Sequence, residues 1–144
     1  MDPRSTAGAR PQLRVVGAIA VGGALGAPAR YGVAQLVHAS PGTFPWATFW
    51  TNLSGSFALG LLLALVLERF PPSRFLRPFV ATGFLGAYTT YSTFAVETVL
   101  LVRAGHPGLA VAYAGASLVG GFVLAWAGIW AARVVPMPTR GGRS

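Results

Sequence analysis

Four long apolar stretches, separated by short polar segments with proline or glycine, make up most of the chain. They predict four membrane-spanning helices, over residues 13–37, 46–68, 78–102 and 108–133. The second and fourth stretches hold the longest runs without a charged side chain, and each is long enough to cross the roughly 30 Å of hydrocarbon in a bilayer. The pattern therefore predicts an all-α integral membrane protein.

Polar segments lie on either side of this apolar region. We expect residues 1–12 to be a disordered tail, residues 13–134 to form a single membrane domain, and residues 135–144 to form a second polar tail. An Ala-x-Ala motif at residues 27–29 imitates the cleavage site of a secretory signal. Because the apolar character resumes after Arg30, an uncleaved first helix fits the sequence better.

The third stretch contains a segment that is a poor continuous helix. From Gly83 to Phe94 it reads Gly-Phe-Leu-Gly-Ala-Tyr-Thr-Thr-Tyr-Ser-Thr-Phe. Glycine costs about 1 kcal/mol relative to alanine in a helix interior, and serine and threonine offer the backbone competing hydrogen bonds. Non-helical backbone at membrane depth survives only where protein or a water-filled cavity satisfies it. We therefore expect a break between Gly83 and Thr90 that lines an ion or solute site; an ordinary glycine-rich packing face is the alternative.

Small and polar residues recur at every fourth position in three of the predicted helices, and side chains with this spacing share one helix face. The three sets are Ala18, Gly22, Gly26 and Arg30; Asn52, Ser56 and Gly60; and Tyr113, Ser117 and Gly121. We expect the first set to be buried against another helix. For Asn52 two interpretations stay open, a hydrogen bond between helices and a donor that faces a pore.

Glu97 lies inside the third predicted span, one turn after Thr93. An ionisable residue near the membrane core is a functional candidate. Because Arg103 follows at the end of the span, an interfacial ion pair or hydrogen bond is the alternative interpretation.

The composition is typical of a membrane protein, and it argues against nucleic-acid binding and enzyme activity. The chain is 53% hydrophobic and only 10% charged, whereas soluble proteins carry about 25% charged residues. The net charge of +8 comes from arginines at the ends of the apolar stretches, where they face lipid headgroups, and no basic patch interleaved with aromatic residues indicates nucleic-acid binding. The sequence contains no cysteine, no catalytic set and no phosphate-binding loop, so we expect no enzyme activity.

Hydrogen-bond donors are the chemistry that the spans do supply. They include the amide of Asn52, several hydroxyl groups and the electropositive edges of aromatic rings. Together with the positive potential of Arg30, these donors suit a small anion better than a cation. Backbone carbonyls exposed at a helix break are hard oxygen ligands, and they suit a buried alkali ion instead.

Three motifs resemble the signatures of the CrcB, or Fluc, family of fluoride channels. They run from Gly22 to Tyr31, from Thr51 to Phe57 and from Gly83 to Phe94, and the third is the most specific. The resemblance covers essentially everything outside the tails. It implies subunits with four transmembrane helices, the third broken near its middle, assembled as an antiparallel dimer. It also implies two fluoride pores and a structural sodium ion, not transported, at the dimer centre.

The resemblance assigns roles to individual residues as well. The main-chain carbonyls of Gly86 and Thr89 from both subunits would hold the sodium ion. The residues that match the fluoride pore are Asn52, Tyr91, Phe94, Ser92, Thr93, Tyr113 and Ser117. Arg30 and Glu97 match the family's arginine in the first helix and the glutamate that follows the second pore aromatic residue, and the resemblance implies a vestibule or packing role for both.

Two features depart from the family pattern in the third motif. Tyr91 stands where phenylalanine is usual, and Gly86-Ala87-Tyr88 replaces Gly-Gly-Leu or a similar sequence. A tyrosine ring keeps its positive edge but adds a hydroxyl group. We therefore expect reduced conduction through the pore that uses Tyr91.

The arginines are unevenly placed. If the four helices alternate in direction, nine arginines share one side of the membrane and only Arg103 lies on the other; the nine are Arg4, Arg10, Arg14, Arg69, Arg74, Arg77, Arg133, Arg140 and Arg143. Such a bias predicts that both termini are cytoplasmic. Since a homodimer of opposed subunits needs both orientations, we hypothesise an antiparallel heterodimer with a paralogous subunit of opposite bias; a homodimer is the alternative.

The sequence thus predicts a passive, fluoride-selective channel of the plasma membrane that exports fluoride from the cytoplasm and reduces its toxicity. Fluoride, membrane lipid and a second subunit are the expected partners, and nucleic acid is not. One alternative is a small proton-coupled multidrug transporter subunit, which would need a deep carboxylate and has only Glu97. The other is a non-conducting accessory membrane subunit.

Overall fold

The computed structural model describes residues 9–37, 40, 42–68 and 74–134, and the regular structure in these ranges is entirely helical. Six elements follow one another: α1 Ala9–Leu36, α2 Trp46–Glu68, the π-helix η1 Pro78–Leu85, α3 Gly86–Tyr88, α4 Tyr91–Arg103 and α5 Pro107–Val134. Because α1 begins at Ala9, the expectation of a disordered tail is wrong for residues 9–12; Pro11 lies in the first helical turn, where proline is tolerated. The rest of the two predicted tails, 1–8 and 135–144, lies outside the described residues.

Three helices contain stretches that are long and apolar enough to cross a membrane. These stretches are Gln12–Leu36, Trp46–Val66 and Pro107–Val134. The third predicted span, residues 78–102, is instead divided among η1, α3 and α4, none of which is long enough alone. We call these three consecutive elements the third rod.

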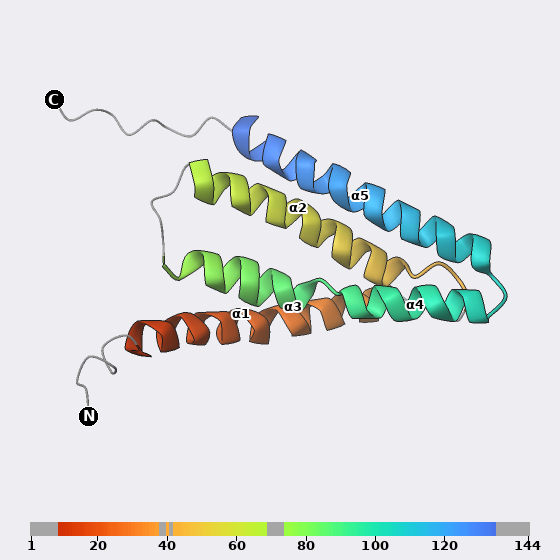
Figure 1. Ribbon diagram of the computed structural model, residues 1–144, viewed down its shortest axis with the longest axis horizontal. Coiled ribbons are helices and arrows are strands. Elements are labelled where there is room, and N and C mark those ends of the chain that lie inside the picture. The colour runs from red at the N-terminus through yellow and green to blue at the C-terminus, as the bar shows by residue number, and fades with distance from the viewer. Residues whose placement is uncertain (1–8, 38–39, 41, 69–73, 135–144) are drawn as a thin grey trace.

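The rods form two closely packed pairs, and the two rods of each pair run in the same direction (Figure 1). In one pair α1 lies along η1 and α3, and in the other α2 lies along α5. The beginnings of α1 and η1 lie at the same end of the molecule as the ends of α2 and α5. The helices therefore alternate in direction along the chain, so that Arg14, Arg74, Arg77 and Arg133 lie toward one end and Arg103 toward the other.

Glycines bring the first pair of rods into backbone contact. Gly22 and Gly26 of α1 are both buried, and a Cβ atom at either position would collide with the backbone of η1. The predicted burial of the first small-residue stripe is confirmed at these two glycines, whereas Ala18 and Arg30 are half-buried. Close backbone approach of this kind is typical of helix packing in membranes.

The second pair of rods is packed in the same way. A Cβ atom at Gly60 of α2 would meet the carbonyl oxygen of Ala125, and one at Gly128 of α5 would meet the carbonyl oxygen of Phe57. Each helix thus contributes a glycine against the backbone of the other. These contacts fix the position of α5 along the axis of α2, and hence which α5 side chains reach the third rod.

The third rod is interrupted at Thr89 and Thr90. Thr89 has ψ 156°, and Thr90 has φ −146° and ψ 119°, so both residues are extended. The predicted break between Gly83 and Thr90 is therefore confirmed. The rod changes neighbours at this point, because η1 and α3 pack against α1 whereas α4 packs against α5.

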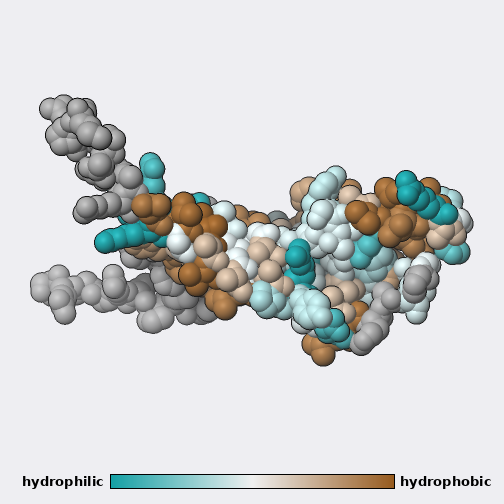
Figure 2. Space-filling model, turned by 90° about the horizontal axis from the view of Figure 1, so that it is seen from below, coloured by the Kyte–Doolittle hydropathy of each residue, from teal (hydrophilic) through white to brown (hydrophobic). Residues whose placement is uncertain are grey.

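Much of the apolar surface is exposed. Figure 2 shows strongly hydrophobic residues gathered toward both ends of the face in view. On α5, Phe122 and Trp126 are 77% and 67% exposed. Soluble monomers rarely expose large contiguous apolar patches to water. The outer surface therefore requires lipid or another chain.

Candidate functional site

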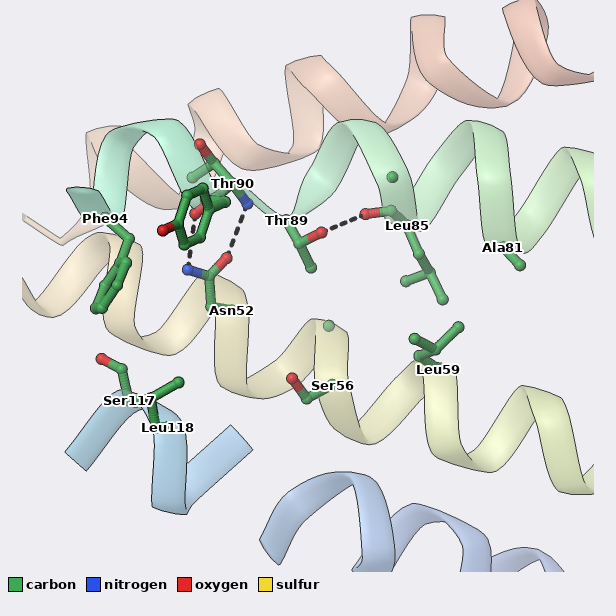
Figure 3. Close-up of a pocket in the computed structure, with 13 residues that line it drawn as sticks. Asn52, Ser56, Leu59, Ala81, Leu85, Thr89, Thr90, Phe94, Ser117 and Leu118 are labelled. Atoms are coloured by element: carbon green, nitrogen blue, oxygen red, sulfur yellow. Dashed lines mark hydrogen bonds between the residues drawn. The ribbon is translucent and has the colours of Figure 1, made fainter. Parts of the chain in front are cut away.

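An open cavity of about 360 Å³ lies between α2, the third rod and α5 (Figure 3). Among the residues that the sequence singled out, the following share its walls: Asn52, Gly86, Thr89, Tyr91, Phe94 and Ser117. Ser56 and leucines from three elements complete much of the lining. The break in the third rod is thus part of the cavity wall.

The side chain of Asn52 is bound to the backbone of the break. Its Nδ2 donates a hydrogen bond to the Thr90 carbonyl oxygen at 2.9 Å, and the Thr90 N–H donates to Asn52 Oδ1 at 2.8 Å (Figure 3). Of the two interpretations of Asn52, the hydrogen bond between helices is therefore present. The amide carries a second N–H, which has no partner among the described residues, and Asn52 is one of the residues that line the cavity.

Gly55 allows α2 and the break to come so close. It is buried, and a Cβ atom there would collide with the side chain of Thr89. The Thr89 hydroxyl itself donates to the Leu85 carbonyl oxygen at 2.9 Å, which keeps the end of α3 closed up to the break. The absence of a side chain at Gly55 thus lets the Asn52 amide reach Thr90.

The backbone carbonyls just before the break lose their helical partners, and those of Gly86 and Thr89 are among them. In a continuous α-helix the Thr90 N–H would bind the Gly86 carbonyl, and the Thr93 N–H would bind the Thr89 carbonyl. Here the Thr90 N–H donates to Asn52, and the Thr93 N–H donates to Thr90 Oγ1 at 3.1 Å. The Gly86 and Thr89 carbonyls therefore lack their α-helical hydrogen-bond partners. Both residues line the cavity.

Thr90 also caps α4 with its hydroxyl group. Besides accepting from the Thr93 N–H, Thr90 Oγ1 donates to Thr93 Oγ1 at 2.9 Å and lies 3.3 Å from Ser92 Oγ. An N-cap threonine of this kind satisfies an otherwise unpaired donor in the first helical turn. Ser92 and Thr93 are exposed and lie outside the cavity lining of this chain.

Glu97 joins α2, α4 and α5 through hydrogen bonds. Its carboxylate accepts from Thr48 Oγ1 at 2.9 Å and from the Tyr113 hydroxyl at 2.8 Å. Tyr113 is fully buried, and its ring lies 5.2 Å from that of Phe94 between centroids. Of the alternatives for Glu97, hydrogen bonding is thus observed. Phe94 separates this cluster from the cavity, which neither Glu97 nor Tyr113 lines.

Ser117 lines the cavity, and its hydroxyl group is unsatisfied. Its Oγ is buried without a hydrogen-bond partner in the described part of the chain. Figure 3 shows this side chain on α5, on the side of that helix that faces Phe94. Buried polar atoms in native structures almost always have a partner, so this hydroxyl calls for water or a ligand.

Sequence reasoning missed several residues that hold the site together, and Arg30 is a further predicted residue that lies outside the cavity lining. Thr48 stands one turn before Asn52, so extending the every-fourth spacing backwards would have found it. The hydrogen bond between Ser54 and Tyr88 had no sequence signal, because it joins two helices. Arg30 is half-buried near the end of α1 and does not line the cavity.

The fold and the cavity define a class, the multi-pass helical membrane proteins with a broken helix beside a donor-lined site. Residues 17–129 match the family model described as CrcB-like protein, Camphor Resistance (CrcB). The chain belongs to this family.

Similar proteins of known name agree with this family. The chain is 45% identical over 107 residues to fluoride-specific ion channel FluC 2 of Streptomyces avermitilis, a match that covers 74% of this chain and 68% of the relative. It is 42% identical over 142 residues to FluC 3 of the same organism, covering 94% and 70%. It is 43% identical over 114 residues to the FluC channel of Hydrogenovibrio crunogenus, covering 78% and 86%. The family is one of ion channels rather than enzymes, as the sequence predicted.

Replacing Asn52 with alanine removes both hydrogen bonds to Thr90. We expect Asn52→Ala to lower the free energy of unfolding by about 2 kcal/mol, because two backbone groups lose their partner. Ser56→Ala is the matched control, since Ser56 lies one turn away on the same face and makes no bond to the break. Unfolding in a denaturing detergent titration measures both. Equal stabilities of the two variants would contradict a structural role for the Asn52 amide.

Proposed function

We propose that this chain is one subunit of a passive, fluoride-selective channel of the plasma membrane, through which fluoride leaves the cytoplasm and its toxicity falls. The observation that carries this proposal is the cavity beside the break. It combines the free N–H of Asn52, the unpartnered hydroxyl of Ser117 and the ring of Phe94, and none of the described residues that line it carries a carboxylate. Donors of this kind can replace the hydration shell of a small anion. The names of the FluC relatives support fluoride as that anion.

The driving force needs no enzyme chemistry. Fluoride enters cells as membrane-permeant HF and ionises at neutral pH. An inside-negative membrane potential drives the anion outward, at about 2.3 kcal/mol per charge per 100 mV. A selective passage is therefore sufficient to lower cytoplasmic fluoride.

The remaining pore residues extend the path along α4 and α5. Ser92 and Thr93 would offer hydroxyl groups from the exposed first turn of α4. Tyr113 would line the path from behind Phe94 with its ring, because its hydroxyl proton is donated to Glu97. In this arrangement Glu97 holds Tyr113 and Thr48 in place, and Arg30 adds positive potential at a vestibule.

A structural sodium ion would be held by main-chain carbonyls of Gly86 and Thr89. The fit is supported by the position of these two carbonyls, which are among those that lack their α-helical partners at the break. Carbonyl oxygens are hard ligands, and alkali ions take such ligands. Two carbonyls are few for a cation, so equivalent carbonyls of a second subunit would complete the set. The ion supplies positive charge that holds the break together, and it is not transported.

A dimer of antiparallel four-span subunits is supported by surfaces that one chain leaves uncovered. Tyr91 lines the cavity but is 81% exposed, so most of its ring has no cover within its own chain. Besides the three long helices, the third rod would also cross the membrane, although it is divided by the break. It would thus supply the fourth span. A second subunit of opposite orientation would cover Tyr91 and close the passage.

The second subunit would be a paralogue of opposite charge bias. The described arginines Arg14, Arg74, Arg77 and Arg133 lie toward the end of the molecule that holds the start of α1, which favours cytoplasmic termini for this chain. Streptomyces avermitilis carries relatives named FluC 2 and FluC 3, so family members do occur together in one organism.

Fluoride efflux from liposomes tests the proposed function. Vesicles that contain the protein, alone or with a paralogous subunit, should release fluoride and retain chloride. Ser117→Ala and Asn52→Ala should each slow fluoride release by about tenfold, the equivalent of one lost polar contact, and Phe94→Ala should slow it by removing the positive ring edge. A fluoride electrode measures the release. Vesicles that keep their fluoride in both preparations would contradict the proposal.

Tyr91→Phe should increase fluoride efflux. The substitution removes a hydroxyl group from the cavity wall and keeps the aromatic ring with its positive edge. Initial efflux rates at equal protein content compare the variant with the parent chain, and Tyr31→Phe on α1 serves as the control. An unchanged rate would show that the Tyr91 hydroxyl does not limit conduction.

Labelling of introduced cysteines tests the orientation of this chain. Because the sequence contains no cysteine, Ala104→Cys and Ser144→Cys each provide a single label. In cells that express only this chain, an impermeant maleimide should react with residue 104 and not with residue 144. Substantial labelling of both positions from outside would indicate two orientations and favour the homodimer.

A further inference from the structure

Ser54 and Tyr88 form a polar contact outside the cavity. Their hydroxyl oxygens lie 2.9 Å apart, and Ser54 Oγ also donates to the Thr51 carbonyl oxygen at 3.1 Å. Since the single proton of Ser54 is used on Thr51, the Tyr88 hydroxyl is the donor to Ser54. The Tyr88 ring stacks on Phe84, with centroids 6.0 Å apart and planes 8° apart. The ring is thus oriented by Phe84, and its hydroxyl group is fixed by Ser54.

Asn52 and Ser54 hold the third rod from two flanks of α2. Side chains two residues apart in an α-helix point roughly 200° apart around its axis. Between these flanks Thr51 and Gly55 are buried, and Gly55 lies against Thr89. The rod therefore crosses α2 over Gly55. Asn52 binds it just after the crossing, at Thr90, and Ser54 binds it just before, at Tyr88.

The position of Tyr88 in the chain links this contact to the released carbonyls. Tyr88 lies between Gly86 and Thr89, so a rotation of α3 that turns either carbonyl also moves the Tyr88 hydroxyl. Asn52 binds the rod only at Thr90, so on the α2 side it leaves the Tyr88 flank of the crossing unattached. The contact with Ser54 supplies the attachment on that flank.

We propose that the Ser54–Tyr88 hydrogen bond is a second tether that holds the Gly86 and Thr89 carbonyls in the arrangement that binds sodium. This inference rests on the proposed sodium site. Tyr88 and Ser54 act as positioning residues, because the ligands to the ion are main-chain oxygens.

The test measures how sodium stabilises the purified full-length protein, with its paralogous subunit if one is required. Melting temperatures are recorded across sodium concentrations, with choline replacing sodium at constant ionic strength. Tyr88→Phe keeps the ring and its stacking on Phe84, and Ser54→Ala removes the acceptor. Each should raise the sodium concentration for half-maximal stabilisation by about threefold to tenfold, the equivalent of one hydrogen bond.

A double variant and a control complete the experiment. Tyr88→Phe combined with Ser54→Ala should shift the sodium midpoint no further than either change alone, because both remove the same bond. Tyr31→Phe removes an exposed hydroxyl on α1 and should leave the midpoint unchanged.

Three results would overturn the inference. The variants could melt at a temperature lowered by the same amount at every sodium concentration, with an unchanged sodium midpoint. The bond would then have a structural role only. Additive shifts in the double variant would mean that the two residues act separately. If the parent protein melts independently of sodium yet conducts fluoride in liposomes, the tether has no ion to position, and the channel function stands. Loss of fluoride conduction in the parent protein is a different failure, that of the proposed function.

Discussion

Two hydrogen bonds between the side chain of Asn52 and the backbone of Thr90 hold the point on which the structure depends. An unpaired backbone group in lipid costs several kcal/mol, so a helix can open at membrane depth only where another group takes over its bonds. A primary amide offers a donor and an acceptor together, as the backbone does. Asn52 therefore satisfies both the N–H and the carbonyl group of Thr90. The carbonyls that precede Thr90 are left without their α-helical partners.

Glycine packing makes this arrangement possible. In each pair of parallel rods the backbones touch where a Cβ atom would collide, at Gly22 and Gly26 in one pair and at Gly60 and Gly128 in the other. The third rod packs on α1 before the break and on α5 after it, so it joins the two pairs. The cavity forms where the rod changes neighbours, and α2 supplies the residue that pins it there.

The features that could be predicted from the sequence are those that depend on residues close together in the chain. Uncharged length predicted the membrane-crossing stretches, glycine and hydroxyl content predicted the break, and four-residue spacing predicted the burial of Gly22 and Gly26. The partner of Asn52 and the cluster of Thr48, Glu97 and Tyr113 could not be predicted, because they depend on which helices pair and at what height. The start of α1 was missed because polar residues and a proline obscured a helical first turn.

The most direct test of this account is the backbone conformation of Thr89 and Thr90 in a lipid bilayer. Carbon-13 chemical shifts from solid-state NMR distinguish helical from extended residues one by one. The account predicts extended shifts at Thr89 and Thr90 between helical shifts at Tyr88 and Ser92. Helical shifts throughout residues 86–93 would contradict it, because the Gly86 and Thr89 carbonyls would then be bonded within the helix.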